Sequence, residues 1–334
     1  MQENSDQVVR RVDPLNSEVR LARLTDGSVT PNDRFYIRNH FPLPKIVAKS
    51  WRLLVTGLVN KPVTMSLPNL MRLRGETIPV TLECAGNGRA LFNPAIEGEP
   101  WALGAVSSAE WTGVKLFDVL DTTEPAPGAT HLVFKSEDGF ERALSIEEAR
   151  EGPVLLAFGM NGEPLPPVHG YPLRAIVPAW YAVASVKWLK EIEVTDHPFA
   201  GHFQVERYIY DTARGVEPVR YQKVRSLITA PEDGQTIAAG DVTIRGLAWS
   251  GAFPLGQVHV SIDGGEWLQA TLQGLPDRYA WRVWNLDARL LTPGVVTIRA
   301  RATDLNRESQ PEQAEWNRLG YGNNSIQTVT VTVS

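Results

Sequence analysis

The stretch of this chain best suited to chemistry holds its single cysteine: Thr81-Leu82-Glu83-Cys84-Ala85-Gly86-Asn87-Gly88-Arg89. The apolar run 78–82 predicts a buried strand that ends in a glycine-rich turn. Side chains at the end of a strand lie at the rim of a sheet, where ligands usually bind. The glycines let the backbone approach a ligand, and Arg89 offers a planar cation suited to an oxyanion. Cys84 is therefore a buried filler, a nucleophile or a metal ligand.

Two other segments carry polar groups on a backbone that prolines stiffen. Arg38-Asn39-His40 is followed by Phe41-Pro42-Leu43-Pro44, and the second segment reads His169-Gly170-Tyr171-Pro172-Leu173-Arg174. The first could direct Arg38 and His40 into one pocket, and the second carries polar groups that could bind an anion; either could instead be a solvated surface loop. The stretch 202–210 mixes aromatic and polar residues, which is unusual for a plain surface loop.

The elements around these segments are short and varied. Residues 1–30 are polar and predict an arm that lies over the surface. Strands are predicted at 51–59, 131–135, 154–160 and 185–195, with hairpin turns at Asp138-Gly139 and Asn161-Gly162. Helices are predicted after Ser66 (ending at Gly75), over 113–121, and after the capping box Ser145-Ile146-Glu147-Glu148. Short helices among many strands favour an α+β fold.

The pattern changes near residue 223. From Ser226 onward, strand-like runs alternate with turns, and no helix pattern interrupts them; the runs include 242–246, 258–262, 279–284, 295–302 and 328–333. About seven short strands over roughly 110 residues predict an all-β, immunoglobulin-like sandwich. We therefore expect two domains, 1–222 with its arm at 1–30, and 223–334.

Composition narrows the function classes. The 334 residues are 43% hydrophobic and 21% charged, and the net charge of −5 argues against a general nucleic-acid binder. No apolar run is long enough to span a bilayer, so no membrane partner is expected. Arg10-Arg11 precedes no apolar stretch, so the sequence as written predicts no signal peptide and a cytoplasmic location; a trimmed mature form would leave the periplasm open. No Cys-x-x-Cys-His motif is present to attach a haem.

These motifs, in this order and spacing, resemble the sulfite oxidase family of molybdenum–pterin enzymes over nearly the whole chain. The resemblance rests on the cysteine segment, on Arg38-Asn39-His40, and on four further segments: Trp101 with 104–111, His169–Arg174, Ser185-Val186-Lys187-Trp188-Leu189 and Trp316-Asn317-Arg318. It implies a molybdopterin-binding catalytic domain followed by an immunoglobulin-like dimerisation domain. A homodimer is the expected state.

The resemblance also implies roles for single residues. Cys84 would bind molybdenum as a thiolate, a soft ligand for a metal that also takes the two dithiolene sulfurs of the pterin. The pterin would contact Asn39, His40, Asp138, His169, Arg174 and Lys187. Substrate binding would fall to Arg38, Arg89, Trp101, Tyr208 and Arg318. Asp138 is equally well explained as part of a hairpin turn, and Trp101 and Tyr208 as core residues; the order Trp-Asn-Arg-Leu-Gly around Arg318 departs slightly from the family motif.

The reaction that this resemblance implies is molybdenum-dependent oxidation of sulfite to sulfate. Nothing in the sequence encodes a cytochrome b5 domain, so we expect the electrons to pass to a separate acceptor, a c-type cytochrome or oxygen. The alternative is an enzyme of the same fold that acts on another oxyanion or on an S- or N-oxide, as nitrate reductases do. An adhesion module, suggested by the sandwich alone, would leave the cysteine segment without a task.

Overall fold

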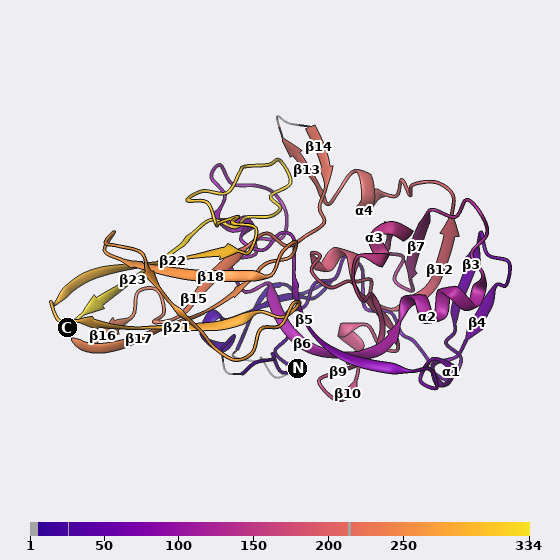
Figure 1. The fold of residues 1–334 in the computed structure, drawn as a ribbon, viewed down its shortest axis with the longest axis horizontal. Coiled ribbons are helices and arrows are strands. Elements are labelled where there is room, and N and C mark those ends of the chain that lie inside the picture. The colour runs from indigo at the N-terminus through magenta and orange to yellow at the C-terminus, as the bar shows by residue number, and fades with distance from the viewer. Residues whose placement is uncertain (1–5, 26, 213–214) are drawn as a thin grey trace.

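The computed structural model describes residues 6–25, 27–212 and 215–334. Figure 1 shows an elongated molecule with a sandwich of long strands at one end and a mixed part with short helices at the other. This arrangement confirms the predicted order of an α+β part followed by an all-β, immunoglobulin-like part.

One sheet of the mixed part carries the cysteine segment. Its strand order is β10-β9-β6-β5, with β11 paired to β9, and the bounds are β5 (Gly75–Glu83), β6 (Val106–Lys115), β9 (Leu155–Met160), β10 (Glu163–Pro164) and β11 (Arg174–Ile176). β5 is therefore the edge strand, and its last four residues, 80–83, are buried as predicted from the apolar run. The free edge of β5 is covered by the sandwich: Thr81 N–H donates to Tyr279 O at 2.9 Å, and Trp281 N–H donates to Thr81 Oγ1 at 2.8 Å.

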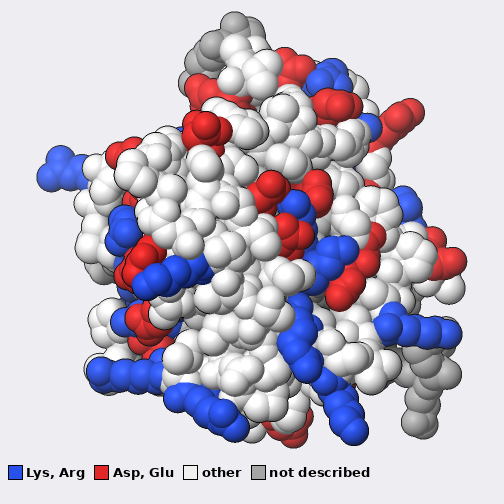
Figure 2. Space-filling view, turned by 90° about the vertical axis from the view of Figure 1, so that its right-hand side faces the viewer, with Lys and Arg blue, Asp and Glu red and all other residues white. Residues whose placement is uncertain are grey.

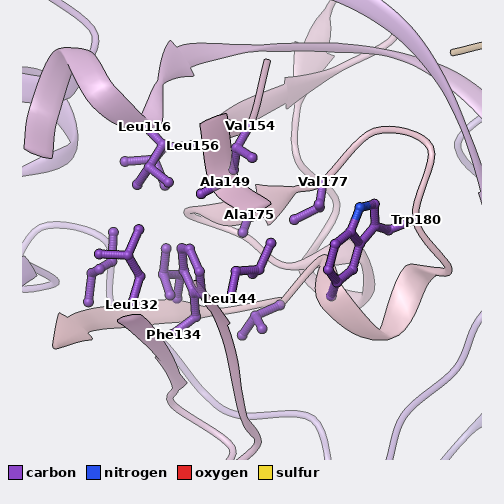
Figure 3. Packing of buried hydrophobic residues seen from close by; sticks show 14 of the residues in the cluster. Leu116, Leu132, Phe134, Leu144, Ala149, Val154, Leu156, Ala175, Val177 and Trp180 are labelled. Atoms are coloured by element: carbon purple, nitrogen blue, oxygen red, sulfur yellow. The ribbon is translucent and has the colours of Figure 1, made fainter. Parts of the chain in front are cut away.

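The second sheet of the mixed part has the order β4-β3-β12-β7-β8, with β12 parallel to β3. Its bounds are β3 (Leu53–Gly57), β4 (Val63–Met65), β7 (His131–Ser136), β8 (Glu141–Ser145) and β12 (Leu189–Thr195). Figure 3 shows apolar side chains of β7 and β8 facing those of β9 and β11, with Trp180 at one end of the cluster. This buried layer fixes the two sheets relative to each other.

The α-helices are four or five residues long: α1 (Leu67–Leu70), α2 (Leu116–Leu120), α3 (Ile146–Arg150) and α4 (His202–Val205). The predicted capping box before α3 is confirmed, because Ser145 and Glu148 each bond the other's backbone N–H. The prediction of a helix over 113–121 is wrong in its first half, because residues 113–115 continue β6 and pair with β9 after a bulge. The helix after Ser66 ends at Leu70 rather than at Gly75, which begins β5.

The sandwich consists of two sheets packed around an apolar core. One sheet has the order β15-β17-β21-β20, and the other has the order β16-β23-β22-β18-β19. The bounds are β15 (Arg225–Ala230), β16 (Thr236–Ile237), β17 (Gly240–Trp249), β18 (Leu255–Ile262), β19 (Leu268–Gln269), β20 (Thr271–Leu272), β21 (Arg282–Leu290), β22 (Gly294–Asp304) and β23 (Gln327–Val333). A hairpin of β13 (Ile209–Thr212) and β14 (Gly215–Pro218) projects between the two parts (Figure 1).

The N-terminal segment is a hairpin of β1 (Gln7–Arg11) and β2 (Asn16–Val19). All four residues of β2 are buried, so the prediction that residues 1–30 lie over the surface is wrong for this strand. The buried polar residues of β2 explain the difference: Glu18 accepts hydrogen bonds from the backbone N–H groups of Ala102 and Gly104, at 3.1 and 2.9 Å. β2 is thus buried although its sequence is polar, because its side chains form hydrogen bonds with neighbouring segments.

The end of the molecule formed by the mixed part carries charges of both signs. Figure 2 shows basic and acidic side chains mixed on that face, without a continuous basic area among the described residues. On the second sheet Lys135 pairs with Glu193 at 2.8 Å and with Glu191 at 3.4 Å. Among the described residues no helix is long and apolar enough to cross a membrane.

Candidate active site

Cys84 follows the last residue of β5, at the rim of the first sheet. Its backbone N–H donates to Ala105 O, and its carbonyl accepts from Asn87 N–H, each at 2.9 Å, so the chain turns immediately after the strand. The side chain is buried, and burial raises the pKa of the thiol, although the guanidinium groups of Arg38 and Arg89 and the N–H of Gly86 act in the opposite direction. A metal that binds this sulfur would fix the deprotonated form.

Two cavities meet at Cys84. The first has an empty volume of about 690 Å³ and the second about 1270 Å³, and four residues line both: Arg38, His40, Cys84 and Tyr208. Asn39, Asp138, His169, Arg174 and Lys187 line only the first, whereas Arg89 and Arg318 line only the second. The structure therefore separates five of the six predicted pterin residues from Arg89 and Arg318, and it places Cys84 with Arg38, His40 and Tyr208 between the two groups.

His169 and Arg174 form one wall of the first cavity. Arg174 begins β11 and donates to the carbonyl oxygens of His169 (2.9 Å) and Ser185 (3.1 Å), while its Nε has no hydrogen-bond partner among the described residues. Burial lowers the pKa of Arg174 to about 10, so it stays charged at neutral pH. Burial, with Lys187 and Arg174 nearby, lowers the pKa of His169 to about 3. His169 is thus a neutral imidazole whose Nε2 lies 3.1 Å from Asn32 O.

Lys187 lies beside Asn39 in the wall of the first cavity. Its ammonium group donates to the side-chain oxygen of Asn39 and, at 3.1 Å, to Val168 O. Burial lowers the pKa of Lys187 well below its usual value; Arg174 and Arg38 add to the effect and Asp138 opposes it. The predicted strand over 185–195 begins only at Leu189, because Trp188 has φ +48° and interrupts the extended backbone. Lys187 therefore lies on a loop at the cavity wall.

Asp138 forms the predicted hairpin turn and also lines the first cavity. It lies between β7 and β8, where its Oδ1 accepts from Phe140 N–H at 3.0 Å and Gly139 takes φ +90°. The two explanations that the sequence leaves open are compatible, since the second carboxylate oxygen is not needed for the turn.

His40 and Tyr208 form a hydrogen-bonded pair on the boundary between the cavities, with His40 Nε2 2.7 Å from the Tyr208 hydroxyl. Burial among Phe140 and Phe203, with Arg38 and Lys187 nearby, lowers the pKa of His40 well below its usual value. Burial raises the pKa of Tyr208. The imidazole is therefore neutral and the phenol protonated, so the pair can donate a hydrogen bond to an anion in the cavity.

The first cavity has the properties that a molybdopterin requires. Three basic side chains, Arg38, Arg174 and Lys187, line it against the single carboxylate of Asp138, and Arg174 keeps a buried N–H without a partner. A phosphate group would offer negative charge and hydrogen-bond acceptors to these basic groups. No cluster of three or more His, Cys, Asp or Glu residues is present among the described residues. Cys84 is thus the one thiolate offered to a metal, which fits a metal that takes its other sulfurs from the pterin.

In the second cavity Arg89 is held in a cradle of glycines. The side chain is buried, donates to Leu319 O (3.2 Å) and Glu99 O (3.0 Å), and lies over the ring of Tyr321. A Cβ added at Gly86 would lie 2.6 Å from both terminal nitrogens of Arg89, and one at Gly320 would lie 2.9 Å from its Cγ. The glycine spacing in the cysteine segment therefore serves the packing of Arg89 as well as the turn.

Arg318 lies at the rim of the second cavity. Its side chain is 56% exposed, and its Nε donates to Asp211 of β13 at 2.9 Å. The next residue, Leu319, is buried and lines the cavity wall. Leu319 thus lies in the cavity wall, with the partly exposed Arg318 beside it at the rim.

Trp101 lines neither of the two cavities formed by the described residues. It is fully buried in the apolar cluster behind the cysteine segment, and its carbonyl accepts from Ala90 N–H at 3.1 Å. Trp101 is thus buried in the core, as the alternative interpretation of this residue expects. Its hydrogen bond with Ala90 places it next to the residue that follows Arg89.

The sequence analysis missed several residues that line the cavities: Tyr36, Ser136, Phe140 and Trp188 in the first, and Glu97, Glu99, Arg207 and Tyr321 in the second. Most are close in sequence to predicted residues, so proximity to the motifs is a usable signal. Glu99 also lies two residues before Trp101, but an acidic residue among prolines and glycines resembles an exposed loop, as does Glu97.

A buried ion pair supports the cysteine segment from the sandwich side. Glu83, the last residue of β5, accepts from Arg225 at 2.8 Å, from Trp249 Nε1 at 2.9 Å and from Asn87 Nδ2 at 3.1 Å. Both charged side chains are almost fully buried, and Arg225 also donates to Asn87 O. Strands β15 and β17 thus fix the residue directly before Cys84.

Comparison with known proteins places this geometry in a family. Residues 40–203 match the oxidoreductase molybdopterin binding domain, and residues 217–334 match the Mo-co oxidoreductase dimerisation domain. The chain is 35% identical to the mitochondrial sulfite oxidase of Homo sapiens over 96% of its own length, and it spans 65% of that protein. It is 31% identical to the sulfite oxidase of Arabidopsis thaliana, covering 95% of this chain and 91% of that protein.

A solved structure agrees with the sequence comparisons. The sulfane dehydrogenase SoxCD of Paracoccus pantotrophus has a TM-score of 0.86 at 27% identity, covering 99% of this chain and 87% of that chain. Because the Arabidopsis relative covers nearly the whole chain and the two family models match its two parts, this protein belongs to the sulfite oxidase family of molybdopterin oxidoreductases.

Proposed function

We propose that this enzyme oxidises sulfite to sulfate and passes the electrons to a separate acceptor. The observation that carries the proposal is Arg38, which lines both cavities beside Cys84, with Arg89 on the wall of the second. Guanidinium groups that face one space attract and orient a small oxyanion. The overall change converts sulfite and water to sulfate, two protons and two electrons, so an electron acceptor is required.

In this proposal the chain's residues hold two groups side by side. Cys84 binds molybdenum, and the pterin contacts Asn39, His40, Asp138, His169, Arg174 and Lys187. When bound, the molybdenum–pterin group supplies the oxygen-atom transfer and the two-electron capacity. Arg38 and Arg89 orient the anion, Arg318 attracts it at the rim, and the Tyr208 hydroxyl donates a hydrogen bond to it.

Steady-state assays test the substrate. We expect turnover of sulfite with ferricyanide as the acceptor and no turnover of nitrate with reduced viologen. Nitrate reduction without sulfite oxidation would overturn the proposal in favour of an enzyme of the same fold with another oxyanion as substrate.

The physiological partners are also proposals. We propose a c-type cytochrome or oxygen as the acceptor, which stopped-flow reduction of cytochrome c and oxygen uptake distinguish. The match to the dimerisation domain supports a homodimer, which light scattering measures directly.

Gly86→Ala is expected to raise the KM for sulfite by about tenfold, because a methyl group 2.6 Å from both terminal nitrogens displaces Arg89 from its place over Tyr321. The measurement is steady-state kinetics with ferricyanide. Gly152→Ala is the matched control, because its added Cβ would lie 3.6 Å from the Tyr279 hydroxyl, an ordinary contact. An unchanged KM in Gly86→Ala would show that Arg89 does not bind the substrate anion.

A further inference from the structure

The N-terminal hairpin contacts the walls of both cavities through the side chain of Asn16, at the start of β2. Asn16 is 0% exposed, and the oxygen and the nitrogen of its side-chain amide form hydrogen bonds with two different partners. Oδ1 accepts from the backbone N–H of Asn39 at 2.6 Å, and Nδ2 donates to the carboxylate of Glu99. We propose that Asn16 is a positioning residue that holds the wall of the first cavity and the wall of the second in one arrangement.

On the side of the first cavity, the hairpin holds Asn39 at both its main chain and its side chain. Asn39 Nδ2 donates to Leu15 O at 3.0 Å, which leaves Asn39 Oδ1 as the acceptor for the Lys187 ammonium group. Ser17 and Ile37 add two backbone hydrogen bonds, of 2.9 and 2.8 Å, beside this contact. A displaced Asn16 would therefore move Asn39 and remove a partner from Lys187.

On the side of the second cavity, Asn16 acts on Arg89 through Glu99. The Glu99 side chain is buried and also accepts from Arg11 of the hairpin at 3.0 Å. The carbonyl of the same residue accepts from Arg89 Nη1 at 3.0 Å, and a Cβ at the preceding Gly98 would lie 3.2 Å from the Arg89 guanidinium. The position of Glu99 thus helps to fix where the guanidinium of Arg89 lies.

The contact requires one donor and one acceptor, which an amide supplies and a carboxylate does not. An aspartate at position 16 would keep the acceptor for Asn39 but would turn a second buried carboxylate toward Glu99, which is costly. If Glu99 became glutamine at the same time, its amide would donate to the new carboxylate at position 16. Both hydrogen bonds could then form again with the groups exchanged.

The experiment compares Asn16→Asp with the double variant Asn16→Asp/Glu99→Gln in the full-length, cofactor-loaded protein. The single variant should raise the KM for sulfite by about tenfold or more, with a smaller change in kcat. It should also release pterin faster during gel filtration, followed by pterin fluorescence and by molybdenum content. The double variant should return both quantities to within about threefold of the starting protein.

Rescue by the exchanged pair is the decisive result, because a loss of packing at position 16 would not be repaired by Glu99→Gln. Wild-type behaviour of the single variant in both measurements, or a double variant no better than the single one, would overturn the proposal. Should Asn16→Asp not fold, Asn16→Ala removes both hydrogen bonds without adding charge, and the same two losses are expected. Asn60→Asp makes the same chemical change at an exposed position and is the control.

The KM measurement rests on the proposed oxidation of sulfite, whereas the retention of pterin does not. If the unmodified enzyme fails to oxidise sulfite, the proposed function fails, and pterin release from the single variant with its rescue still decides the role of Asn16. If the unmodified enzyme oxidises sulfite and the variants match it in both measurements, only the role of Asn16 fails.

Discussion

Cys84→Ser is expected to abolish sulfite oxidation, with kcat lowered by more than about 100-fold. The side chain lies where the two cavities meet, and it is the chain's only thiol. A soft thiolate suits a metal that also binds dithiolene sulfur, whereas a serine hydroxyl is a harder ligand that keeps its proton at neutral pH. Loss of groups that merely orient metal ligands already costs 10–100-fold, so loss of the ligand itself should cost more.

Turnover with ferricyanide, molybdenum content and the electron paramagnetic resonance spectrum after sulfite addition measure this effect together. The exchange of one atom leaves the backbone hydrogen bond from residue 84 to Ala105 in place, so circular dichroism should be unchanged. Wild-type turnover in the serine variant would show that Cys84 does not bind the metal.

Arg225→Met is expected to lower the free energy of unfolding by about 3–5 kcal/mol, because it leaves the Glu83 carboxylate buried without its cation. Glu83 keeps two neutral donors, Trp249 and Asn87, which do not replace a charge. Burial already raises the pKa of Glu83, with Arg225 acting against it. Urea denaturation followed by tryptophan fluorescence measures the loss, since Trp249 contacts the affected carboxylate.

Arg289→Met provides the matched control for this prediction. Arg289 and Asp241 form an ion pair of 3.5 Å whose side chains are 71% and 88% exposed, so its removal should cost at most about 1 kcal/mol. Equal effects of the two substitutions would mean that the buried pair does not anchor the sandwich to the cysteine segment.

The parts of the site that lie within motifs could be predicted from the sequence. The strand before Cys84, the hairpin turn at Asp138 and the capping box at Ser145 each depend on neighbouring residues, so local patterns were sufficient. The convergence of Arg38, His169 and Lys187 on one cavity depends on contacts distant in sequence, and only the resemblance to a known family indicated it.

The remaining features depend on tertiary structure that no local pattern reports. Because the backbone at Trp188 is left-handed, β12 begins later than the sequence predicts. After the bulge at Thr112, β6 continues into a segment whose sequence has helical periodicity. The buried strand β2 looked like a surface arm, because its polar side chains resemble those of a solvated segment until their partners are known. Arg225 and Glu83 lie far apart in sequence, and neither stands in a pattern that pairs them.

The sandwich segment 279–281, which bonds to Thr81, also determines whether the chain can be divided. A catalytic half released from the sandwich would expose the outer side of β5, where the Thr81 amide would lose its partner, to any other extended peptide. Bare edges of this kind invite intermolecular pairing and aggregation. In this enzyme the dimerisation domain thus also covers an edge strand of the catalytic domain, so we expect the two domains to be stable only when they stay on one chain.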